Sequence, residues 1–279
     1  MFYKQKNMFV VLLIILSIIC LIVFVDSVFI EPYNLKITEN TFNLFNQTGE
    51  PIKVVLISDI HIASQEKGYL TEVVNKINEL EPDLILIAGD SIDYFESELQ
   101  ELEPLKKLNA PLGKFAALGN HDYGIWGCNN PIPKIDKQTE KRLNDLGISV
   151  LRNELEIIES NNKRFAVFGI DDAWLCKNNY SNALRNLDAS TVKIVFTHNQ
   201  VSFSTNDTDS KTLVLAGHTH CGQIQIPFLT DFLLEQSGFG KISGGRAKYG
   251  DGEIYVTCGV TTGKVRFLTN PEISVIYLK

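Results

Sequence analysis

All five histidines of this chain lie in short polar turns that follow apolar runs, and this arrangement restricts the possible folds more than any other feature. His61, His121 and His198 each follow one run, and His218 and His220 follow another. In each of these turns Asp, Asn or a second His stands close by. Open α/β sheets bind ligands beyond the carboxyl ends of their strands. The pattern therefore predicts strands whose ends bring polar side chains to one place.

The rest of the chain alternates strand and helix signals. Apolar runs of strand length are separated first by amphipathic stretches and later by turn residues. Predicted strands cover residues 52–57, 84–88, 114–118, 148–151, 154–159, 164–170, 192–196, 212–216, 254–257 and 273–278, and predicted helices cover 69–80, 96–108 and 137–146. We expect an α/β fold, a mixed β-sheet sandwich flanked by helices. The Gly-rich segment 227–252 is expected to form a long loop near the site that touches substrate or membrane.

Composition limits the class of protein. A chain of 279 residues that is 44% hydrophobic can bury the core of one large domain. Its formal net charge of -7 argues against a broad basic groove, so no nucleic acid partner is expected.

Residues 8–25 form an uncharged apolar stretch, which as a helix would be about 27 Å long, close to the hydrocarbon thickness of a bilayer. We expect a short cytoplasmic N-terminus (1–7), a transmembrane anchor (8–30), a linker and entry segment (31–51) and a catalytic domain (52–279). Lys4 and Lys6 precede the stretch while Asp26 and Glu31 follow it, which predicts a single-pass protein with an extracytoplasmic domain. The alternatives are a cytoplasm-facing domain, a cleaved signal peptide or a buried helix.

The cysteines show no CxxC spacing, so neither a zinc ribbon nor a thioredoxin-type motif is expected. Cys128, Cys176, Cys221 and Cys258 could pair in an oxidising compartment. Free thiols are the simpler interpretation, because a domain of this size does not need disulfides to be stable.

The polar turns have the composition of a transition-metal site. Carboxylate, amide and imidazole ligands together suit Mn, Fe, Zn, Ni or Co better than calcium. In an extended Asp59-x-His61 or His218-x-His220, side chains two apart point to the same side, so each pair can act as a chelate. Glycines at 89, 119 and 217 allow sharp turns where the strands end.

Taken in order, these turns resemble the motif series of the calcineurin-like metallophosphoesterases. The motifs are Asp59-x-His61, Gly89-Asp90-x-x-Asp93, Gly119-Asn120-His121-Asp122, His198 and Gly217-His218-Thr219-His220. The C-terminal stretch from Glu253 resembles the membrane-associated bacterial phosphodiesterases of that superfamily, whose members carry an N-terminal hydrophobic or export segment. Segments 30–38 and 217–224 fit that subgroup as well.

The resemblance implies two divalent metal ions and a role for each motif residue. One metal would be held by Asp59, His61, Asp90 and His220, and the second by Asp90, Asn120, His198 and His218. A dimetal-bound hydroxide would attack phosphorus, and His121 would protonate the leaving oxygen or support the charged transition state. Asp93 and Asp122 would orient the ligands.

The substrate is expected to be a phosphoester, and a membrane anchor favours one that is lipid-linked or part of the cell envelope. Arg246 and Arg266 are candidates to bind its phosphate, and Arg246 is preferred because it lies in the Gly-rich segment. The predicted function is that of a phosphodiesterase. The alternatives are a non-catalytic metal-binding scaffold on the same fold, or an enzyme of lipid A synthesis resembling UDP-diacylglucosamine pyrophosphatase if the domain faces the cytoplasm.

Overall fold

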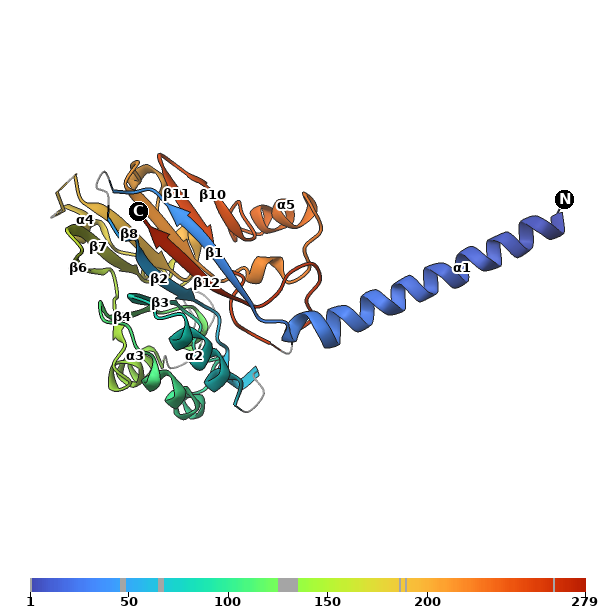
Figure 1. Cartoon of the computed structure of the whole chain (residues 1–279), viewed down its shortest axis with the longest axis horizontal. Helices are drawn as coiled ribbons and strands as arrows, with labels where there is room; N and C mark the ends of the chain where they lie inside the picture. The colour runs from blue at the N-terminus through green and yellow to red at the C-terminus, as the bar shows by residue number, and fades with distance from the viewer. Residues whose placement is uncertain are drawn as a thin grey trace.

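The fold consists of two six-stranded sheets that pack face to face, with helices outside them and a long helix projecting from the domain (Figure 1). The computed structural model describes residues 2–45, 49–64, 68–124, 135–185, 187–188, 190–262 and 264–279. The predicted α/β sandwich flanked by helices is therefore confirmed.

The first sheet has the order β1-β12-β2-β3-β4-β5, and β2 to β5 run parallel. Its strands are β1 (Lys36–Phe42), β2 (Ile52–Ile57), β3 (Leu84–Ala88), β4 (Lys114–Ala117), β5 (Ser149–Val150) and β12 (Glu272–Leu278). The second sheet has the order β10-β11-β9-β8-β7-β6, with β7, β8, β9 and β11 parallel. Its strands are β6 (Glu154–Ser160), β7 (Lys163–Ile170), β8 (Val192–Thr197), β9 (Thr212–Ala216), β10 (Gly245–Tyr249) and β11 (Gly252–Val256).

The α-helices are α1 (Phe2–Val25), α2 (Tyr69–Glu79), α3 (Asp136–Asp145), α4 (Ser181–Arg185) and α5 (Leu229–Gln236). Helix α2 buries Leu70, Val73, Val74 and Ile77, a spacing that places all four on one face. This face packs on the outer side of the first sheet. Between the sheets, Leu56 and Leu86 share a core with Phe196 of the second sheet.

Three segments differ from the prediction. The expected linker 31–51 contains β1, which pairs with β12; its polar sequence hid it, because an edge strand buries few side chains, here only Phe42. The expected helix 96–108 is a 3₁₀ segment, η4 (Glu96–Lys107), and Pro104 inside it cannot donate a helical hydrogen bond. The expected loop 227–252 contains α5 and β10.

Helix α1 continues through a π-helical turn, Asp26–Ile30, into a 3₁₀ turn, Glu31–Tyr33. The apolar segment Asn7–Tyr33 is long and apolar enough to cross a bilayer, a property that a signal sequence shares. Its end is attached to the domain, because Arg266 N–H donates to the Ser27 carbonyl (2.9 Å) and Leu268 N–H donates to the Glu31 carboxylate (2.9 Å).

Candidate metal centre

The predicted ligands converge where the carboxyl ends of the two sheets meet. Asp59 and His61 follow β2, Asp90 follows β3, and Asn120 follows β4 of the first sheet. The second sheet contributes His198 after β8, and His218 and His220 after β9. Each sheet therefore supplies only part of the set.

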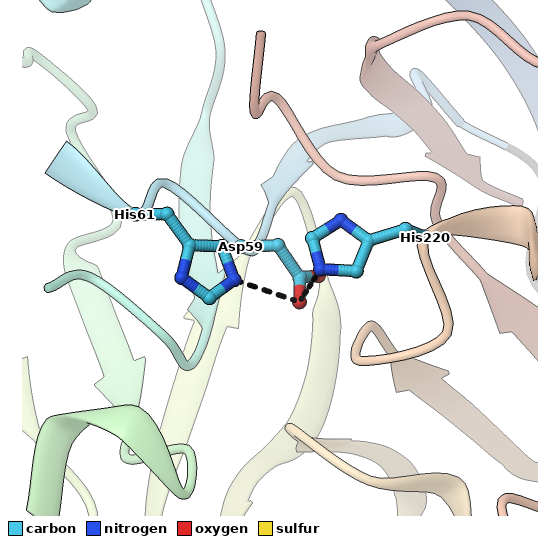
Figure 2. Close-up of side chains that lie close together, drawn as sticks. All are labelled: Asp59, His61 and His220. Atoms are coloured by element: carbon cyan, nitrogen blue, oxygen red, sulfur yellow. Dashed lines mark ion pairs between the residues drawn. The ribbon is translucent and has the colours of Figure 1, made fainter. Parts of the chain in front are cut away.

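One cluster consists of Asp59, His61 and His220, whose ligand atoms all lie within 4.8 Å of one another. Figure 2 shows both imidazoles turned toward the Asp59 carboxylate. Asp59 Oδ1 lies 3.4 Å from His220 Nε2 and 4.0 Å from His61 Nε2. The other oxygen, Oδ2, accepts a hydrogen bond from the His218 backbone N–H (3.0 Å), which holds this carboxylate against the second sheet.

A second cluster consists of Asp90, His198 and His218. Asp90 Oδ2 lies 3.0 Å from His198 Nε2, and the same oxygen lies 3.6 Å from His61 Nε2 in the first cluster. Asp90 therefore stands between the two groups. His198 Nε2 and His218 Nδ1 are 2.9 Å apart, so two ring nitrogens converge beside this carboxylate.

Several buried atoms of this site have no hydrogen-bond partner among the described residues. They include Asp59 Oδ1, both amide atoms of Asn120, and His218 Nε2. Unsatisfied polar atoms are costly in a buried site unless something compensates them. Divalent cations would do so, and the carboxylate, amide and imidazole set fits them. The predicted ligands thus suit the metals that the resemblance implies.

Five of these side chains sit on left-handed backbone. The φ angles are 54° at Asp59, 46° at His61, 55° at Asp90, 72° at His218 and 49° at His220. Such conformations are unfavourable for residues with a Cβ and persist where the surroundings enforce them. The expected extended geometry for Asp59-x-His61 and His218-x-His220 is therefore wrong. His218 and His220 also belong to different clusters and do not form one chelate.

Glycine is required at two of the strand ends for two different reasons. Gly89 has a φ of +81°, so it makes the turn that was expected of it. Gly119 has no such angle, but a Cβ there would lie 2.2 Å from Asp90 Oδ1. It allows close approach of the backbone to the carboxylate that links the clusters.

Neighbouring groups hold the ligands in place. The Asp122 carboxylate accepts backbone N–H groups from Asp90 (2.8 Å) and Gly119 (2.9 Å), which joins the turns after β3 and β4. Asp93 Oδ1 lies 3.3 Å from His61 Nδ1 and leaves Nε2 of that ring facing the carboxylates. These contacts agree with the orienting roles expected of Asp93 and Asp122.

Burial and neighbouring charges shift the pKa values of the site residues in both directions. Burial would raise the pKa of Asp90, but His198, His121 and His61 outweigh it and hold that pKa well below its usual value. Burial would lower the pKa of His198, and Asp90 instead raises it to about 10. Burial, reinforced by His198, lowers the pKa of His218 to about 3. Burial and the charge of His61 likewise push the pKa of His220 well below its usual value.

A cavity of about 360 Å³ opens beside the two clusters. Its walls include Asp90, Tyr94, His121, His218, Thr219, His220, Gly222, Gln223, Leu234, Phe239 and Lys264. His121 thus reaches the cavity, and its Nε2 lies 4.0 Å from Asp90 Oδ2. Its Nδ1 lies 2.7 Å from the Asp93 carbonyl, which accepts a hydrogen bond from Nδ1–H and so fixes the tautomer.

Among the described residues, neither of the two predicted arginines lines the cavity. Arg246 lies on β10, pairs with Glu253 (2.6 Å) and does not line the cavity, so its position does not support the expected contact with substrate. Arg266 is buried and donates to the carbonyls of Cys258 and Thr261. Lys264 does line the cavity. The sequence analysis missed Lys264, because the sequence marks it only as a basic residue shortly after strand β11.

The interpretation of the cysteines as free thiols is wrong. Cys221, next to His220, forms a disulfide with Cys258, which follows β11. Cys176 is also disulfide-bonded, while Cys128 lies outside the described residues. The spacing of Cys221 and Cys258 in the sequence did not indicate a disulfide, because the adjacent parallel strands β9 and β11 bring the two residues together.

Comparison with known proteins agrees with this geometry. The family model for calcineurin-like phosphoesterases matches residues 52–222, which include all seven predicted ligands. The uncharacterized metallophosphoesterase YkuE of Bacillus subtilis is 31% identical, covering 90% of this chain and 88% of that protein. The phosphodiesterase YaeI of Escherichia coli is 26% identical, covering 89% of this chain and 90% of that protein.

Proposed function

Because this chain belongs to the calcineurin-like phosphoesterase family, we propose that it hydrolyses a phosphodiester with two divalent cations held where its two sheets meet. It is a phosphoric ester hydrolase by family. To this family activity the proposal adds the number of metal ions, a phosphodiester as the substrate class and the role of each site residue.

The position of Asp90 carries the proposal. Its carboxylate approaches His61 of one cluster and His198 of the other, as expected of a ligand shared by two ions. Asp59, His61, Asp90 and His220 would hold one ion, and Asp90, Asn120, His198 and His218 the other. Two such ions would supply activated water near neutral pH and charge stabilisation at phosphorus.

Residues of the cavity wall take the remaining roles. Nδ1–H of His121 donates a hydrogen bond to the Asp93 carbonyl, so Nε2, which lies 3.4 Å from the Tyr94 hydroxyl, is the ring atom that would exchange a proton with a leaving oxygen. Lys264 places a positive charge in the same wall, where it attracts the phosphate of the substrate.

The diester and the lipid link rest on two further observations. A relative that matches along most of its length carries the name phosphodiesterase. Helix α1 has the length and composition of a membrane span, which would keep the domain close to membrane or envelope substrates.

The disulfide between Cys221 and Cys258 supports an extracytoplasmic domain, since such bonds persist in oxidising compartments. It argues against the alternative of a cytoplasmic lipid A enzyme. Alkaline phosphatase is active only outside the cytoplasm. A fusion of this reporter after Lys279 should therefore be active. An inactive fusion, together with an active cytoplasmic reporter at the same position, would reverse this orientation.

Purified full-length protein in detergent tests the function. With manganese it should hydrolyse bis-p-nitrophenyl phosphate and contain two metal ions per chain by elemental analysis. Asp90→Ala should lose both properties, while Asp209→Ala, which alters an ion pair with Lys193 outside the site, should keep them. Absence of turnover with every divalent metal, in protein that still binds metal, would favour the scaffold.

A further inference from the structure

The segment that leads into and forms α5 exposes a row of large apolar side chains. We call this row the α5 face; its members are Ile224, Ile226, Phe228, Leu229, Phe232 and Leu233. Phe228 is 91% exposed, and Phe232 and Leu233 are each more than half exposed. Folded proteins rarely leave so many neighbouring apolar side chains in water unless a partner covers them.

The α5 face is joined to the foot of the membrane-span candidate α1. The Gln225 backbone N–H donates a hydrogen bond to the Phe267 carbonyl (2.8 Å), which attaches the start of the face to segment 264–270. That segment is in turn hydrogen-bonded to Ser27 and Glu31, in the two turns that follow α1. The connection consists of backbone hydrogen bonds and one hydrogen bond that the Glu31 carboxylate accepts, so the two surfaces hold a defined relation to each other.

The connecting pieces are apolar as well. Val265 and Leu268 of the bridging segment are exposed, as are Phe29 and Ile30 just before the domain begins. Figure 1 shows α5 on the side of the domain from which α1 projects. If α1 crosses a bilayer, its end brings this side of the domain to the membrane surface.

We propose that the α5 face docks into the interfacial layer of the lipid bilayer in which α1 is anchored. The free energy of apolar side chains falls when they enter that layer, and Tyr33, in the 3₁₀ turn beyond α1, is of the type that favours the membrane–water boundary. A protein partner is the competing occupant, but only the bilayer is placed beside this face by the chain's own helix.

The docked face would lie beside the catalytic cavity. Leu234 follows Phe232 and Leu233 in α5 but lines the cavity, and Phe239 just beyond the helix lines it too. Phe239 also stacks on the ring of His218 (5.2 Å between centroids). This part of the inference rests on the proposed function: a cavity in this position selects amphipathic phosphodiesters that present their head groups at the bilayer surface.

Fluorescence quenching tests the docking without reference to hydrolysis. Full-length protein carrying Cys20→Ser and either Phe228→Cys or Leu233→Cys is labelled with an environment-sensitive dye and reconstituted in phosphatidylcholine vesicles. The dye at either position should shift to the blue and be quenched by lipids with a doxyl group on the acyl chain. Glu156→Cys, on strand β6 at the far edge of the second sheet, is the matched control and should show neither effect.

Absence of quenching at both positions 228 and 233 overturns the proposal, and it is also the result expected if a protein partner covers the face.

A second measurement addresses the substrate class. Phe228→Glu with Leu233→Glu should reduce turnover of a phosphodiester lipid in vesicles and leave turnover of bis-p-nitrophenyl phosphate unchanged. An equal loss on both substrates would contradict the substrate class, and no turnover by the unsubstituted protein would instead contradict the proposed function.

Discussion

At the scale of single residues, the site depends on side chains whose neighbours fix their direction. The His198 ring lies with Nδ1 3.0 Å from the Ala88 carbonyl, so Nε2 faces Asp90. Asp93 does the same for His61. Ligands held in this way lose little conformational freedom when a cation binds, and this favours metal affinity.

Asp93→Asn should weaken metal binding by about 10–100-fold, because the amide no longer supplies the negative charge that orients and polarises His61. Competition with a fluorescent chelator measures the affinity. Asp145→Asn removes an exposed carboxylate paired with Lys141 and should leave the affinity unchanged. Equal affinity in both variants would show that Asp93 has no orienting role.

His121→Asn should lower kcat by about 10²–10⁴ while the protein keeps two metal ions, because in the proposed function the residue handles a proton and is not a ligand. Turnover of bis-p-nitrophenyl phosphate and elemental analysis of the same sample give both quantities. His121 also lies within 4.8 Å of ligand atoms of His61 and Asp90, so a loss of one metal would identify it as a ligand instead.

At the scale of elements, short turns after parallel strands carry the chemistry, and cross-links hold those turns together. Asp122 connects the turns after β3 and β4. The disulfide connects the turn after β9, which holds His220, to the segment after β11. Gly259 in that segment lies so close to Asp59 that an added Cβ would be 2.7 Å from the Asp59 Cβ.

Cys221→Ser with Cys258→Ser should lower the free energy of unfolding by about 2–4 kcal/mol, because the unfolded chain is no longer constrained by the bond. Denaturant unfolding measures the change. Cys20→Ser removes an exposed free thiol outside the domain and is the control expected to have no effect. A stability unchanged by the double substitution would mean that the bond is not formed in the folded protein.

At the scale of the whole molecule, the candidate metal centre lies where the two sheets meet. The first sheet supplies Asp59, His61, Asp90 and Asn120, and the second supplies His198, His218 and His220. Cations bound there would link the two halves of the sandwich, and a ligand that binds only the folded state also stabilises it.

Removing metal with a chelator should therefore lower the melting temperature, and adding manganese should restore it. At a free metal concentration of about 100 times Kd the stabilisation is about 2.7 kcal/mol for each site. Calorimetry of full-length protein measures the shift. Asp90→Ala should show almost no response to either treatment, and an identical response in this variant would contradict the assignment of the site.

The sequence alone determined the α/β sandwich, the apolar helix and the identity of the candidate ligands. Local patterns encode these features, because alternating apolar runs and polar strand ends are visible within a few residues. Asp59, Asp90 and His198 could be selected in this way. Strand β1 escaped detection because an edge strand buries little and so leaves a weak pattern.

Only the tertiary structure decided how these residues meet. The left-handed backbone at Asp59 and His220 is imposed by packing around the turns, which no local pattern records. The pairing of Cys221 with Cys258 and the place of Lys264 in the cavity wall depend on contacts between segments distant in sequence. The same holds for Arg246, because β10 directs it to Glu253 at the sheet edge and away from the cavity.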